Sequence, residues 1–73
     1  MSRAEVMKFA RGLLFCRGVL AHGDRLQSKS TMTPNGLICT LYIVGKGIVA
    51  RGASWAHCYG NLRANTMPQA VNP

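Results

Sequence analysis

Acidic side chains are almost absent from this chain of 73 residues. Glu5 and Asp24 are the only two, against nine Lys and Arg, so the formal net charge is +7. Two isolated carboxylates do not supply the paired acids of a glycosidase or the ligands of a two-metal site. We therefore expect no enzyme and no catalytic residues. The excess of positive charge favours a polyanionic partner.

Cysteine is scarce and follows no disulfide or metal-binding pattern. Cys16, Cys39 and Cys58 are odd in number and contain no CxxC spacing. His22 and His57 form no local ligand pair with them, so the sequence predicts no metal site and no cofactor. We interpret the three cysteines as small buried hydrophobes of a protein in a reducing, cytoplasmic environment.

Long apolar runs are also missing. The longest strongly apolar stretch, residues 37–44, is too short to cross a bilayer as a helix, so we expect no membrane partner. A chain of 73 residues forms one domain with a small core, which assembly into a homo-oligomer would stabilise.

The N-terminal residues carry a helix signal. Ser2 and Glu5 fit a capping box, and apolar residues then recur at helical spacing. This pattern predicts a short helix over residues 3–11, ended by Gly12. An irregular arm over residues 1–12 is the alternative.

The remaining segments have the alternation and turn residues of a β protein. Strands are predicted over residues 13–20, 37–44 and 53–62, with a further short strand or bend at residues 48–50. The glycines around Lys46 end the strand before it. In residues 37–44 one face is apolar and the other is mixed, and Trp55, His57 and Tyr59 would share one side of the last strand.

Two polar segments complete this organisation. Residues 22–35 predict a long, mobile, basic connection that ends in the tight turn Pro34-Asn35-Gly36, where Asn35 and Gly36 tolerate positive φ. Residues 64–73 lack any pattern, and we expect a flexible C-terminal tail.

Short motifs lie in a characteristic order along residues 13–63. They are Phe15-Cys16-Arg17-Gly18-Val19-Leu20, Pro34-Asn35-Gly36, Ile43-Val44-Gly45-Lys46, Arg51-Gly52 and Tyr59-Gly60-Asn61-Leu62-Arg63. In this order they resemble the bacterial single-stranded-DNA-binding protein family and its primosomal PriB-like relatives, which are OB-folds. The resemblance implies a mainly β fold with a small OB-like barrel over residues 13–63.

The resemblance and the charge together predict non-catalytic binding of single-stranded DNA or RNA through a basic barrel surface. Proteins of this class combine cations that contact phosphates with aromatic rings on which bases stack. The predicted nucleic-acid-binding residues are Arg17, Arg25, Lys29, Lys46, Arg51, Trp55, Tyr59 and Arg63. For Trp55 and Tyr59, a place in the core is the alternative.

Two other interpretations stay open at this point. One is a structural or interaction subunit of a larger assembly, such as a ribonucleoprotein. The other is a recombined or artificial chain that folds without an evolved role. Gly45-Lys46-Gly47 lacks the spacing of a P-loop, so nucleotide hydrolysis is not predicted.

Overall fold

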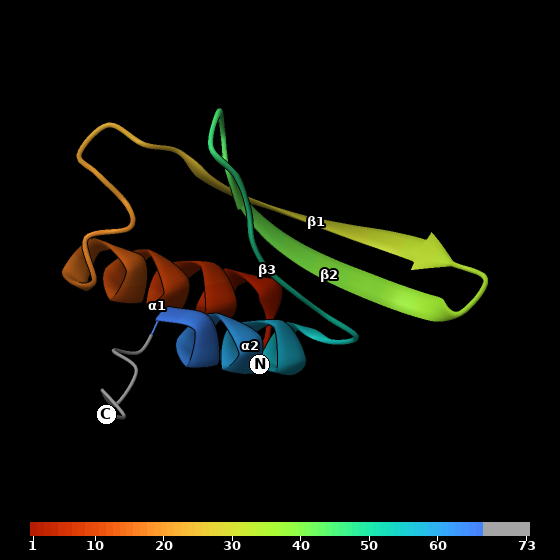
Figure 1. Ribbon diagram of the computed structural model, residues 1–73. Helices are drawn as coiled ribbons and strands as arrows, with labels where there is room; N and C mark the ends of the chain where they lie inside the picture. The colour runs from red at the N-terminus through yellow and green to blue at the C-terminus, as the bar shows by residue number, and fades with distance from the viewer. Residues whose placement is uncertain (67–73) are drawn as a thin grey trace, which may run out of the picture.

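The computed structural model describes residues 1–66 and shows an open sheet covered on one side by two helices (Figure 1). The elements are α1 (Arg3–Cys16), β1 (Leu26–Thr33), β2 (Gly36–Ile43), β3 (Gly47–Gly52) and α2 (Trp55–Thr66). The strands form one antiparallel sheet in the order β1-β2-β3. The fold is therefore mixed α/β, and the sheet does not close into the predicted barrel.

Helix α1 begins as the sequence predicts. The Ser2 hydroxyl accepts a hydrogen bond from the Glu5 amide at 3.2 Å, and the Glu5 carboxylate accepts one from the Ser2 amide at 2.9 Å. The hydrogen bond from the Ser2 amide to the carboxylate, aided by the Ser2 hydroxyl, lowers the pKa of Glu5 below its usual value. Both bonds satisfy amides that have no partner within the helix.

The end of α1 corrects the sequence prediction. The helix continues through Gly12 to Cys16, and residues 17–20 form a turn and a bend, so no strand forms over residues 13–20. Val6, Ala10 and Leu14 lie four residues apart and are completely buried. Their packing against the sheet extends the helix, because one helical face then contributes three residues to the core.

The hairpin of β1 and β2 was predicted in part. The turn at Pro34-Asn35-Gly36 and the strand that follows it are confirmed, with Gly36 at φ 121° but no positive φ at Asn35. The predicted basic connection over residues 22–35 is correct only for its first part, because residues 26–33 form β1 and pair with β2. Burial alternates at the start of β1, where Leu26 and Ser28 are buried and Gln27 and Lys29 are exposed, as in a strand with one solvated face.

Strand β3 pairs with β2 through an irregular register. Leu41 lies opposite Ala50 and Tyr42 lies opposite Ile48, so Val49 is an extra residue on β3. This bulge keeps Ala50 on the helix side of the sheet and Ile48 on the opposite side.

Helix α2 replaces the strand that we predicted over residues 53–62. The Ser54 hydroxyl accepts a hydrogen bond from the His57 amide at 3.1 Å, and the Ser54 carbonyl accepts one from the Cys58 amide at 2.9 Å. Cys58 and Leu62 are one helical turn apart and completely buried. Burial at this spacing favours a helix over the alternation suggested by the aromatic residues.

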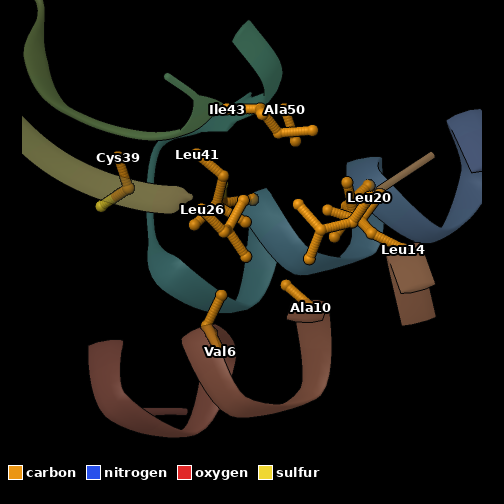
Figure 2. Packing of buried hydrophobic residues seen from close by; sticks show 11 residues of the cluster. Val6, Ala10, Leu14, Leu20, Leu26, Cys39, Leu41, Ile43 and Ala50 are labelled. Carbon is orange, nitrogen blue, oxygen red and sulfur yellow. The ribbon is translucent and has the colours of Figure 1, made fainter. Parts of the chain in front are cut away.

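The core lies between the helices and the sheet (Figure 2). Its residues are Val6, Ala10, Leu14, Leu20, Leu26, Cys39, Leu41, Ile43, Ala50, Cys58 and Leu62. Burial of Cys39 and Cys58 is confirmed, whereas Cys16 is exposed. Burial, together with the neighbouring Cys39, raises the pKa of the Cys58 thiol. Residues 64–66 continue α2, and the rest of the predicted tail lies outside the described residues.

Candidate functional site

The face of the sheet that the helices leave uncovered carries the most suggestive group of side chains. Because successive strand residues point to opposite faces, the register places one set of residues away from the helices. We call this set the open face. It consists of Gln27, Lys29, Thr31, Ile38, Thr40, Tyr42, Ile48 and Arg51.

One row across the open face is basic. Lys29 of β1 and Arg51 of β3 both lie opposite Thr40 of the central strand, and both are exposed. Thr40 is only 3% exposed although no helix covers this face, so the surrounding side chains of the open face shield it. Two cations therefore flank a packed polar centre, without an acidic residue anywhere on the open face.

An aromatic ring lies directly beside this row. Tyr42 is half-buried on β2, between Gln27 and Ile48. The Lys29 ammonium lies 5.7 Å from the centroid of its ring. A cation over an exposed ring contributes about 0.5–1 kcal/mol, whereas stacking of a nucleic-acid base contributes about 1–3 kcal/mol. A base can therefore displace the ammonium from the ring, and the freed cation can contact a phosphate.

A shallow depression lies at the edge of β2. It has a volume of about 470 Å³ and is lined by residues of both faces, Ile38 and Arg51 from the open face and Leu37 and Gly52 from the helix side, together with the β1–β2 turn and Ala53. It lies where β3 has ended and the β1–β2 hairpin projects further (Figure 1).

The two predicted stacking residues lie in the helical layer instead. Trp55 and Tyr59 are half-buried on α2 and pack against the core. The Tyr59 ring also packs against Phe9 of α1, with the ring centroids 6.1 Å apart. His57, which we expected on the same strand face, is exposed on the helix. The structure thus separates these aromatic residues from the open face.

The remaining predicted cations are distributed over the molecule. Arg17 caps the C-terminus of α1, and Arg63 lies in the last turn of α2. Lys46, in the β2–β3 turn, forms an ion pair of 2.7 Å with Asp24, while Arg25 lines a second depression beside α1. Of the eight predicted residues, the structure brings only Lys29 and Arg51 together on the open face.

Tyr42 is the residue of this group that sequence reasoning missed. The alternation in residues 37–44 already placed Ile38, Thr40 and Tyr42 on a mixed face. The available signal was a tyrosine on the mixed face of a predicted strand, with basic segments before and after this strand in the sequence. It could not be used without knowing that both helices cover the other face.

No family model, curated protein or solved structure matches this chain. The OB-fold family and the homo-oligomer therefore stay predictions. Within residues 1–66, no helix is long and apolar enough to cross a membrane, and no group of three or more His, Cys, Asp or Glu could hold a metal ion.

Proposed function

We propose that this protein binds single-stranded nucleic acid on the open face of its sheet. The observation that carries the proposal is the juxtaposition of Tyr42 with Lys29 and Arg51 on a face that no helix covers. An aromatic platform with flanking cations matches the two interactions that every nucleotide offers, a base to stack and a phosphate to neutralise. Neither interaction depends on base identity, so weak sequence preference is expected.

The function keeps the prediction made from the sequence and changes its location. Stacking is assigned to Tyr42, and phosphate contacts are assigned to Lys29 and Arg51. The depression beside Arg51 would receive the next nucleotide along the strand. A duplex keeps its bases stacked in its interior, so Tyr42 could not stack on them.

The first test is a titration of fluorescein-labelled oligothymidine with the full chain at two salt concentrations. Tyr42→Ala should weaken binding by about 5- to 150-fold, which corresponds to the 1–3 kcal/mol of one stacked base. Tyr42→Phe is the matched control and should bind nearly as well as the wild type, because it keeps the ring. Equal affinity of the wild type and Tyr42→Ala would contradict the assignment.

The cations are tested by the salt dependence of the same titration. Lys29→Gln and Arg51→Gln should each make the log–log salt slope less steep by about 0.7, the value for one phosphate on a single strand. Lys8→Gln removes an exposed charge from the outer side of α1 and should leave the slope unchanged.

Two further observations in this titration separate the alternatives. Trp55 lies in the helical layer, so its emission should not change on binding, whereas quenching would favour the stacking role predicted from the sequence. Duplex RNA as a competitor should be weaker than the single strand, and equal competition would indicate binding by shape and phosphate alone. Absence of binding at low salt would favour the subunit of a larger assembly.

A further inference from the structure

A second depression lies beside the last turns of α1 and the loop that follows this helix. It has a volume of about 460 Å³, within the usual range for small-molecule sites. Its lining includes Arg11 and Phe15 of α1, His22 and Arg25 of the following loop, and the first residues of β1. Of the lining residues, Gln27 also belongs to the open face, where it lies opposite Tyr42; Lys29, Tyr42 and Arg51 themselves do not line this depression.

The loop that forms this depression is held in place by several hydrogen bonds. The amides of Val19 and Leu20 both donate to the Leu14 carbonyl, at 2.9 and 3.1 Å. Further along, the Ala21 amide donates to the Asp24 carboxylate at 2.9 Å, and the Asp24 amide donates to the Ala21 carbonyl at 3.0 Å. A shape fixed by backbone bonds reduces the ordering that a ligand would have to impose.

The charge of the depression is positive because its only carboxylate is already paired. Asp24 lies 2.7 Å from the Lys46 ammonium, and this hydrogen bond, with that from the Ala21 amide, lowers the pKa of Asp24. By contrast, the guanidinium groups of Arg11 and Arg25 form no hydrogen bond or ion pair with any residue in the described part of the chain. Two guanidinium groups without a partner in residues 1–66 therefore line the same depression.

An apolar wall stands beside these cations. Phe15 is 55% exposed and Leu20 and Leu26, which also line the depression, are buried in the core. A free phosphate would leave the ring of Phe15 unused, whereas a phosphate attached to a planar ring would use both parts. Guanidinium groups suit phosphate because their donors match its oxygens in pairs, and an exposed ring suits stacking.

We propose that this depression binds a nucleoside monophosphate, with Arg11 and Arg25 on the phosphate and Phe15 against the base. The same chemistry occurs in a free mononucleotide and in the phosphorylated end of a strand. The site does not depend on the open face, so it can exist whether or not the proposed function is correct.

Calorimetric titration of the full chain with AMP tests the site, with adenosine and inorganic phosphate as partial ligands. AMP should bind more tightly than either. Arg11→Gln and Arg25→Gln should each weaken AMP binding about tenfold or more, as expected for loss of a hydrogen bond to a charged group. Phe15→Leu should weaken AMP more than phosphate. Lys8→Gln, on the same helix but outside the depression, should stay within about twofold of the wild type.

Amide chemical shifts locate the binding and guard against unfolded variants. AMP should shift the amides of residues 21–25 and leave that of Ile38, at the far end of β2, unchanged, and the variants should retain the dispersed spectrum of the wild type. No AMP binding at low salt, equal binding of adenosine, or unchanged affinity in folded Arg11→Gln and Arg25→Gln would overturn the proposal.

Oligothymidine with and without a 5′-phosphate separates the two sources of the ligand. A tighter complex with the phosphorylated strand, lost in Arg25→Gln but not in Tyr42→Ala, would assign the site to a strand end. AMP binding without any effect of the 5′-phosphate would assign it to the free nucleotide. Failure of the open face would instead appear in Tyr42→Ala with oligothymidine, while AMP binding stayed intact.

Discussion

The two faces of the sheet are built from the same strands but have opposite chemistry. On the helix side, β2 contributes Cys39, Leu41 and Ile43, which are 0–2% exposed. On the open face, the same strand contributes Thr40 and Tyr42, next to the cations of its neighbours. The helix side buries apolar side chains and so stabilises the fold. The open face holds exposed cations beside a half-buried ring, which contribute less to stability, and this difference makes it the candidate site.

The largest expected loss of stability comes from replacing Leu41 of the helix side with alanine, compared with the same replacement of Tyr42 on the open face. Leu41→Ala should lower the free energy of unfolding by about 2–5 kcal/mol, because it leaves a cavity in the core. Tyr42→Ala, one residue further, should lower it by much less, because its ring is only half-buried. Urea denaturation followed by circular dichroism measures both variants. Similar losses in the two variants would show that the open face also stabilises the fold.

A second prediction concerns the contact that fixes α2 to the helix side. A Cβ on Gly52 would lie 2.5 Å from the backbone nitrogen of Cys58. In Gly52→Ala the end of β3 and helix α2 must therefore move apart. We expect a loss of about 1–3 kcal/mol, as for an overpacked core. In Gly12→Ala a Cβ would meet no atom within 4 Å, and the helix should gain about 0.5–1 kcal/mol. Thermal melts of the two glycine variants should therefore shift in opposite directions.

The smallest expected effect is the pH dependence of the fold's stability. It arises from two carboxylates that lie outside the sheet, so it belongs to neither face. Asp24 and Glu5 are the only acidic side chains, and hydrogen bonds lower both pKa values in the folded state. A carboxyl with a lowered folded pKa stabilises the protein above its unfolded pKa, and this contribution is lost as the pH falls through the folded value. Stability should therefore decrease on acidification below the ordinary carboxyl range.

The control is the double variant Glu5→Gln and Asp24→Asn, measured by thermal melting across the same acidic range. Its melting temperature should depend less on pH than that of the wild type. An unchanged acid dependence in the double variant would assign the effect to groups other than these two side chains.

The sequence predicted the elements whose signals are local. The capping box at Ser2 and Glu5 defined the start of α1, and the turn at residues 34–36 with the alternation that follows defined β2. It wrongly assigned residues 13–20 and 53–62 to strands and residues 26–33 to a loop. For residues 13–16 and 53–62, a short segment of this kind fits a strand and a helix equally well. Packing of Leu14, Cys58 and Leu62 in the core decided between them, and that information is tertiary.

The candidate site shows the same division. Lys29 and Arg51 were predicted from the charge together with the OB-fold resemblance, and they lie together on the open face. Trp55 and Tyr59 were predicted from an alternation that a helix does not preserve. Tyr42 could be recognised only after both helices were placed on the other side of the sheet. Residue types in the sequence suggested cations and aromatic rings as binding groups. The packing of both helices on one face of the sheet determines which of these residues remain accessible to a ligand.

The bulge at Val49 has a consequence for which mutations the gene can accept. Side chains of a strand alternate with a period of two, so a single codon deleted within β2 would turn Leu41 and Ile43 outward and Tyr42 inward. On β3 the bulge accommodates one extra residue, Val49, and still leaves Ala50 on the helix side. β2 pairs with β1 without such an irregularity, so a change of length is accommodated more readily in the two turns that flank β2 than within the strand.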